Sequence, residues 1–324
     1  MSERDRGSIK LSFVIPAYNA ADTIGSAIRS IVFPKADIPD TWSVEIIAVD
    51  DGSEDDMARS AIASAGRMAA ALNVVHHLEN RGKCAATNTG IKATSGDLVI
   101  ILDADDEMVD DWPLEFAEVL CEWPTENQVC YCACRNDRGE LTTDYQGGST
   151  IVTIDDLIRQ RYAGEYLPCF RGPYIRARPY VDLGLLKRPC EIVSYLSFVA
   201  DGPFWFSNRI LRHYHEGRPG ALSHDLTAAD KAADMARCYE FLLSTFGDLY
   251  RLKAPTMYRR KLLRQAVYLS LARQPGAWKT WLRGAHVSCS IESVGALLVL
   301  LLGRRFCAEA VAVGRRIRLI KRYG

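Results

Sequence analysis

The stretch Leu98–Trp112 reads LVIILDADDEMVDDW. It begins with five consecutive apolar residues, as expected of a strand buried on both faces, and turns acidic at Asp103. Carboxylates so close in sequence repel one another and lose hydration when they are buried. The stretch therefore indicates a core strand whose carboxyl end is either a solvated loop or a site that gathers cations.

Three further strand signals precede this stretch, and helical patterns separate them. The strands LSFVI, VEIIAVD and NVVHH cover residues 11–15, 44–50 and 73–77. Apolar residues recur at helical spacing after each of the first two, and a further helical pattern follows Lys83. This alternation predicts an α/β fold with a Rossmann-like, mostly parallel sheet covered by helices on both faces.

The second half of the chain is less regular. A helix after Trp112 and the strand QVCYCAC precede an excursion rich in Asn, Asp and Gly at residues 135–148, and prolines interrupt residues 150–220. Helical periodicity returns at Ser223. The expected domains are one over residues 8–222, with halves 8–110 and 111–222, and a helical C-terminal extension over residues 223–324.

The composition excludes some classes of protein. Forty basic residues balance forty acidic ones, so we expect no nucleic-acid partner. Ten scattered cysteines and a charged N-terminus, MSERDRGSIK, favour free thiols in a cytoplasmic protein. In CYCAC, the thiols of Cys130, Cys132 and Cys134 share one strand face, which is typical of buried core cysteines rather than of a zinc site.

The last residues are basic. Between Gly303 and Gly324, seven Arg and Lys residues stand against one acid, Glu309. The preceding apolar run SVGALLVLLLG is too short to span a bilayer. Two interpretations are open: an amphipathic helix on the inner face of the cytoplasmic membrane, or a helix packed on the protein with a solvated Arg face.

Polar and acidic motifs follow three of the predicted strands. They are PAYN at residues 16–19, DDGS at 50–53 and DADD at 103–106. Ligands bind at the carboxyl ends of strands in open parallel sheets. Carboxylates separated by one residue suit Mg²⁺ or Mn²⁺, which also take phosphate oxygens as ligands. Taken singly, DDGS is typical of a turn, DADD of a helix start and PAYN of a strand end. Their order at the ends of consecutive strands favours a shared site instead.

Three longer segments carry a resemblance to a known family. They are FVIPAYNAADTIGSAIRSI, IIAVDDGSEDD and NRGKCAATNTGIKATSGDLVIILDADD, at residues 13–31, 46–56 and 80–106. In order and spacing they resemble the N-terminal half of family 2 glycosyltransferases of the GT-A fold. The resemblance implies an inverting enzyme that takes a sugar from a nucleotide-diphosphate donor, with a UDP-sugar as the expected donor.

The resemblance also implies a set of site residues. The expected nucleotide-sugar contacts are Pro16, Ala17, Tyr18, Asp51, Ser53, Asn80, Gly82, Asp103 and Ala104. Asp105, together with Asp103, matches the family's metal-binding D-x-D motif and is expected to hold Mg²⁺ or Mn²⁺. Asp106, Glu107 and the Asp110–Asp111 pair are expected to form the solvated start of the next helix.

One position departs from the family pattern. The family often has Arg in the Ala-Arg-Asn sequence, whereas this chain has Thr87. Either Arg81 or Lys83 is a candidate to supply the missing cation, and the sequence does not choose between them.

Inverting transfer needs a base that takes the proton of the acceptor hydroxyl. By resemblance, Glu191 occupies the position of this base, although the family's usual Glu-Asp pair is reduced to one acid. The alternative is that Glu191 is a solvated helix-start acid after Pro189, with Asp182 or Asp201 as the base. His215 is a weaker candidate for contact with the diphosphate or the acceptor.

The implied acceptor is a glycan or a lipid-linked hydroxyl compound of bacterial surface polysaccharide synthesis. Two other classes of function are also open. One is a catalytically inert scaffold that binds a nucleotide sugar. The other is a sugar nucleotidyltransferase, which shares the fold but needs a glycine-rich, basic loop that PAYNAADTIG lacks.

Overall fold

The structure, a computed structural model, describes residues 8–66, 71–184, 191–216, 229–287 and 290–316. The side chains of residues 229–230 and 304–316 are not among those described. The chain divides into a first unit, residues 1–154 and 162–217, and a second unit, residues 155–161 and 218–324. The domain boundary expected after Leu222 lies outside the described residues.

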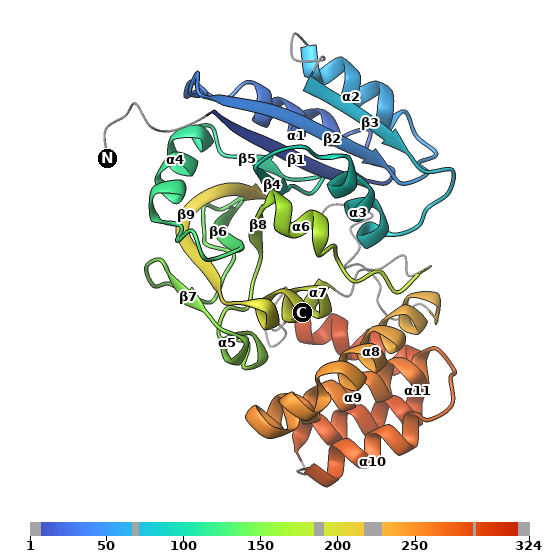
Figure 1. The fold of residues 1–324 in the computed structure, drawn as a ribbon. Helices are drawn as coiled ribbons and strands as arrows, with labels where there is room; N and C mark the ends of the chain where they lie inside the picture. Colours follow the sequence, from blue (N-terminus) through green and yellow to red (C-terminus); the bar gives the residue numbers. More distant parts are fainter. Residues whose placement is uncertain (1–7, 67–70, 185–190, 217–228, 288–289, 317–324) are drawn as a thin grey trace. The chain divides into compact units, whose positions relative to one another are not determined.

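The first unit is built on one sheet with strand order β3-β2-β1-β4-β8-β6-β9-β5 (Figure 1). Its first half is parallel, as the sequence predicts. The parallel strands are β1 (Ile9–Ala17), β2 (Trp42–Asp50), β3 (Leu72–His76) and β4 (Leu98–Ile101). Because the pairing aligns Ala17 with Asp50, the ends of β1 and β2 lie beside each other.

The second half of the sheet is mixed. Strand β8 (Tyr166–Arg171) is antiparallel to both β4 and β6 (Val129–Asn136), and β9 (Phe204–Tyr214) is parallel to β6. Two short strands, β5 (Glu107–Met108) and β7 (Thr150–Val152), pair antiparallel with β9. This half depends on pairings between distant segments, and strand β8 was not predicted.

Helices cover both faces of the sheet because alternate strand residues point to opposite sides. The helices of this unit are α1 (Ile24–Val32), α2 (Met57–Ala65), α3 (Lys83–Ala93), α4 (Trp112–Glu122), α6 (Gly172–Ala177) and α7 (Glu191–Asp201). Phe13 and Ile15 of β1 belong to the core that includes residues of α1, α2 and α4. Val14 points to the other face, where Gly90 lets α3 approach closely.

The structure confirms some local predictions and corrects others. Cys130, Cys132 and Cys134 are buried in the core, as predicted. The prediction of a solvated helix start is confirmed for Asp110 and Asp111, which are exposed directly before α4. It is wrong for Asp106, which is 1% exposed, and for Glu107, which belongs to β5. The reason is that the pairing of β5 with β9 draws this segment into the sheet.

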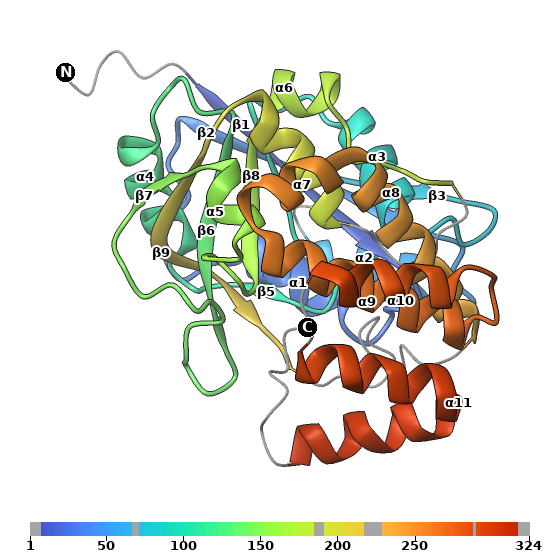
Figure 2. The same ribbon diagram turned by 90° about the horizontal axis from the view of Figure 1, so that it is seen from below.

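The second unit is helical, as the sequence predicts. It contains most of α5 (Ile154–Ile158), and then α8 (Ala229–Lys253), α9 (Pro255–Leu271), α10 (Ala277–Val287) and α11 (Ile291–Arg316). Helix α11 changes direction at Gly303, where φ is 75° and ψ is −160° (Figure 2). No described helix has the length and apolarity needed to cross a membrane. The side chains of the predicted basic tail, from Arg304 onward, lie outside the described residues.

A polar cluster at the opposite end of the strands fixes their alignment. Glu45 of β2 accepts hydrogen bonds from Ser12 Oγ of β1 at 2.5 Å and from the Ser95 backbone at 2.7 Å. Lys10 Nζ pairs with Glu45 at 2.7 Å, and the Gly96 N–H donates to Ser12 Oγ. These contacts join β1, β2 and the turn before β4. They therefore fix the alignment of the three strands and the relative positions of their carboxyl ends.

We predict that Glu45→Gln lowers the free energy of unfolding at neutral pH by about 2 kcal/mol. Burial acts to raise the pKa of Glu45, but hydrogen bonds from Lys10, Ser12 and Ser95 lower it to about 2. A folded-state pKa below the usual value stabilises the protein above about pH 4.5, and this stabilisation is lost as the pH falls toward 2.

Urea unfolding of the wild type and Glu45→Gln at several pH values measures this effect. The difference between them should shrink as the pH falls below about 4.5. Glu79→Gln, at an exposed position, is the matched control. A difference that stays constant with pH would contradict the role of the Glu45 carboxylate.

Candidate active site

The ends of β1 and β2 bring together the PAYN, DDGS and NRG segments. Asp51 is 3% exposed, and its carboxylate accepts the backbone N–H groups of Arg81 at 3.0 Å and Gly82 at 2.8 Å. His77 Nδ1 lies 2.6 Å from the same carboxylate. Asp51 therefore fixes the loop that begins α3, in addition to lying where the sequence predicts a nucleotide contact.

The other expected nucleotide-sugar residues lie around this edge. Pro16 and Ala17 end β1, and Tyr18 beyond them is 45% exposed. Ser53 Oγ accepts the backbone N–H of Asn19 at 2.9 Å, which ties PAYN to DDGS. Asn80 Oδ1 accepts the Gly82 N–H at 3.1 Å, so it shapes the loop before α3. Ala104, between the two acids of DAD, is buried.

The acids after β4 form a compact cluster. Oxygen atoms of Asp103, Asp105 and Asp106 lie within 4.8 Å of one another, a set that could hold a metal ion. Asp106 accepts the backbone N–H of His215 at 3.0 Å and lies 3.2 Å from Arg212 Nη1. Burial, only partly offset by Arg212, raises the pKa of Asp106 to about 8. A proton on Asp106 reduces the repulsion within the cluster.

Two basic side chains, Lys83 and Arg212, form ion pairs with these acids. Lys83, the first residue of α3, places Nζ 2.7 Å from Asp103 Oδ1 and 2.9 Å from Glu191 Oε1. Arg212 of β9 is 2% exposed and lies 3.6 Å from Asp103 Oδ2. Burial acts to lower the pKa of Lys83, but Asp103 and Glu191 raise it well above its usual value. The ammonium is therefore charged and links the two acids.

The two candidates for the missing cation lie in different surroundings. The Thr87 hydroxyl donates to the Lys83 carbonyl one helical turn earlier, at 2.8 Å. Lys83 and Thr87 line the same cavity, whereas Arg81 is exposed on the loop. Lys83 therefore places a positive charge next to the position where the family often has Arg.

Of the three candidates for the base, Glu191 lines the cavity beside Lys83, whereas Asp182 and Asp201 do not. Its lining residues are Lys83, Thr87, Ile101, Asp103, Glu165, Tyr166, Pro168, Tyr180, Glu191, Tyr195 and Arg212. Glu191, the first residue of α7, is thus brought next to Asp103. Asp201, at the other end of α7, pairs with Arg178 at 2.8 Å, and Asp182 accepts the Gly184 N–H within a turn.

Some residues of this cavity were not predicted. Arg212, Glu165 and Tyr180 come from the region that the sequence leaves irregular. A signal for Arg212 was nonetheless present, because a buried acidic cluster requires a buried cation and Arg212 directly follows the apolar residues Ile210 and Leu211. Neither Glu165 nor Tyr180 has a local pattern that marks it.

His215 belongs to a second polar cluster. Its Nδ1 lies 2.6 Å from Asp137 Oδ1, and His213 Nε2 lies 3.5 Å from the same oxygen. These three side chains also meet the spacing expected of metal ligands. The backbone N–H of His215 also donates a hydrogen bond to Asp106. His215, which the sequence suggested as a contact for the diphosphate or the acceptor, therefore connects the two clusters.

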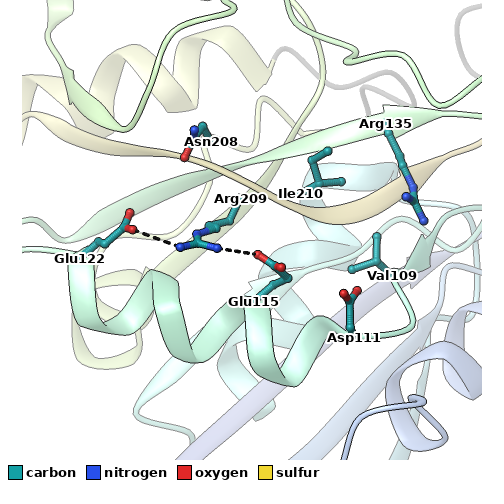
Figure 3. A pocket seen from close by; sticks show the side chains of 8 residues that line it. All are labelled: Val109, Asp111, Glu115, Glu122, Arg135, Asn208, Arg209 and Ile210. Atoms are coloured by element: carbon teal, nitrogen blue, oxygen red, sulfur yellow. Dashed lines mark hydrogen bonds and ion pairs between the residues drawn. The ribbon is translucent and has the colours of Figure 1, made fainter.

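A second hollow of the first unit lies elsewhere (Figure 3). It measures about 600 Å³ and lies between α4 and β9. Arg209 crosses it and pairs with Glu115 at 3.4 Å and Glu122 at 3.7 Å. None of the site residues predicted from the sequence lines it. The chemistry therefore points to the smaller cavity at Lys83.

Comparison with known proteins places these features in a family. Residues 12–174 match the family described as Glycosyl transferase family 2. Succinoglycan biosynthesis protein ExoU of Rhizobium meliloti is 42% identical over 96 residues, which cover 29% of this chain and 25% of that protein. Dodecaprenyl-phosphate galacturonate synthase of Rhizobium johnstonii is 34% identical over 98 residues, 30% of this chain and 28% of that protein.

A longer match is to the uncharacterized glycosyltransferase YibD of Escherichia coli, 33% identical over 205 residues. It covers 59% of this chain and 52% of YibD, so the chain spans from a quarter to about half the length of these relatives.

Solved structures share the fold. TarS residues 1–349 of S. aureus, in complex with UDP-GlcNAc, has a TM-score of 0.60 and 18% identity, over 85% of this chain and 79% of that one. Mannosyltransferase PcManGT of Pyrobaculum calidifontis, in complex with GDP-Man and Mn²⁺, has a TM-score of 0.53 and 18% identity, over 97% of this chain and 81% of that one.

We predict that Lys83 and Glu191 are energetically coupled. A double-mutant cycle of Lys83→Met and Glu191→Ala, measured by urea unfolding, should give a coupling of about 1 kcal/mol or more, because these side chains are partly shielded from solvent. The same cycle on the more exposed Arg178–Asp201 pair is the control, and its coupling should be about 0.5 kcal/mol. Additive effects of the Lys83 and Glu191 changes would refute the link.

Proposed function

The chain belongs to glycosyltransferase family 2, and from this premise we propose that it is a metal-dependent inverting transferase. Its donor is a nucleotide-diphosphate sugar, and its acceptor is a hydroxyl of a glycan or of a lipid-linked compound. The supporting observation is the link from Asp103 through Lys83 to Glu191, with Nζ 2.7 Å and 2.9 Å from the two acids. It joins the predicted donor site to the predicted base.

In this proposal the two halves of the site have separate roles. The nucleotide lies along the edge formed by Pro16, Ala17, Tyr18, Asp51 and Ser53, with Asn80, Gly82 and Ala104 beside it. Asp105 and Asp103 hold Mg²⁺ or Mn²⁺, whose charge stabilises the diphosphate leaving group. The acidic cluster supports this role, because its three oxygens lie close enough to share one ion.

Glu191 accepts the proton of the acceptor hydroxyl as the hydroxyl attacks the sugar. Lys83 Nζ lies 2.9 Å from Glu191 Oε1 and so holds the carboxylate beside the predicted donor site. Tyr195 lines the same cavity and is the proposed aromatic contact for a sugar ring.

A UDP-sugar is the proposed donor. TarS is in complex with UDP-GlcNAc and PcManGT with GDP-Man, so neighbours of this fold accept either nucleotide. The names of the relatives support a polyprenyl-phosphate-linked acceptor and surface glycan synthesis. The proposed location is the cytoplasm, at the inner face of the cytoplasmic membrane.

We predict that Asp105→Ala abolishes Mn²⁺-dependent UDP binding and sugar transfer. Removing a carboxylate ligand should weaken UDP binding in the presence of Mn²⁺ by more than about tenfold. Titration calorimetry with UDP, GDP and dTDP measures this loss and identifies the nucleotide. Asp110→Ala, at an exposed residue paired with Lys35, is the control. Unchanged binding by the Asp105 variant would exclude the proposed metal ligand.

We predict that Glu191→Gln keeps UDP binding but slows transfer by about 10²–10⁴-fold, because the amide cannot accept the proton. A radiolabelled transfer assay measures the rate. Full transfer by this variant, with loss in Asp182→Asn or Asp201→Asn, would reassign the base. UDP binding by a wild type that transfers no sugar to any glycan or lipid-linked acceptor would instead support the scaffold alternative.

A further inference from the structure

Helices α10 and α11 of the second unit expose an unusual amount of apolar side chain. Eight of the fifteen exposed large apolar residues in the described part of the chain lie on these two helices. Seven of them form what we call the apolar stripe: Trp278, Leu282, Ile291, Val294, Leu298, Leu301 and Leu302. On α11 the spacing of three and four residues places these side chains on one face.

The inward faces of the same helices carry small side chains. Helix α10 buries Ala277, Thr280 and Gly284, and a Cβ at Gly284 would lie 3.0 Å from Leu263 of α9. Helix α11 buries Ser293, Ala296 and Val299. A bundle stabilised only by its own core would turn its large apolar residues inward. Here seven large apolar side chains remain on the outer face, which indicates that a partner covers it.

A hydrogen bond joins the two helices that carry the apolar stripe. Trp281 of α10 donates its indole N–H to the Ser293 carbonyl of α11 at 2.9 Å. This bond fixes the helices side by side before α11 changes direction at Gly303 (Figure 2). Trp278, at 49% exposure, stands on the outer face and packs edge-on against Trp281.

The charges beside the stripe identify the occupant. Lys279, Arg283 and His286 are exposed on α10, and the sequence of α10 contains no acid. The acid at the start of α11, Glu292, is occupied by Arg259 at 2.5 Å and Arg260 at 2.7 Å of α9. The surface is therefore apolar with a basic edge, and it complements an anionic surface. A second copy would bring the same positive charges together.

We propose that α10 and the part of α11 up to Gly303 dock on the surface of an anionic lipid bilayer. Trp278 and the leucines of the stripe enter the headgroup region, while Lys279 and Arg283 meet lipid phosphates. This surface is distinct from the basic tail beyond Gly303. The role of this docking rests on the proposed function, because it would bring the enzyme to a lipid-linked acceptor. The docking itself does not depend on that function.

Vesicle flotation of the full chain tests the proposal without donor or acceptor. The wild type should float with vesicles rich in phosphatidylglycerol and much less with phosphatidylcholine alone. Trp278→Ser/Leu282→Ser/Leu298→Ser should reduce the bound fraction more than about tenfold. Leu252→Ser, which removes an apolar side chain 79% exposed on α8, is the matched control and should float like the wild type.

A second variant keeps the test independent of folding effects in the triple variant. Lys279→Gln/Arg283→Gln should lose about tenfold of the preference for anionic vesicles and become less sensitive to salt. Circular dichroism checks that each variant folds.

Three outcomes would overturn the proposal: no flotation of the wild type, equal flotation of folded triple variant and wild type, or a change from dimer to monomer in sedimentation caused by the triple variant. The last would assign the stripe to a second copy. Transfer to a soluble acceptor should be unchanged in these variants, so failure of vesicle binding is distinguishable from failure of the proposed function.

Discussion

The ammonium of Lys83 lies between a carboxylate that follows β4 and one that begins α7. Its position depends on the rest of the sheet edge. Asp51 holds the Gly82 N–H at the start of α3, and Gly90 lets α3 pack against Val14 of β1. At the far end of the strands, Glu45 aligns β1 and β2 with the turn before β4. Together these contacts position Lys83 between Asp103 and Glu191.

The same contacts explain how a buried strand can end in so much acid. Three carboxylates within 4.8 Å would repel strongly in a protein interior. Lys83 and Arg212 oppose this repulsion with positive charge, and the raised pKa of Asp106 favours a bound proton there. In the function that we propose, the same two cations lie beside the phosphates of the donor.

The sequence predicted the parallel half of the fold because β1, β2 and β4 carry apolar runs that end in recognisable polar motifs. It could not predict β8, since that strand is defined by antiparallel pairing with distant β4 and β6 and is interrupted by Pro168. Asp106 was misassigned for a similar reason: it resembles a helix start, but the pairing of β5 with β9 buries it.

The position of Lys83 between its partners is also a tertiary property, because Glu191 lies over a hundred residues away in sequence. In the helical unit, the sequence drew attention to the basic tail, whereas the exposed face of α10 and α11 became visible only when the structure showed which side of each helix is buried.

The anomalous difference map of crystals grown with Mn²⁺ and UDP tests the central claim most directly. We expect one manganese peak at coordination distance from Asp105 and Asp103, with the diphosphate beside it and Lys83 between Asp103 and Glu191 or turned toward the phosphates. A manganese peak confined to Asp137, His213 and His215, or a UDP molecule bound without metal away from Asp103, would contradict it.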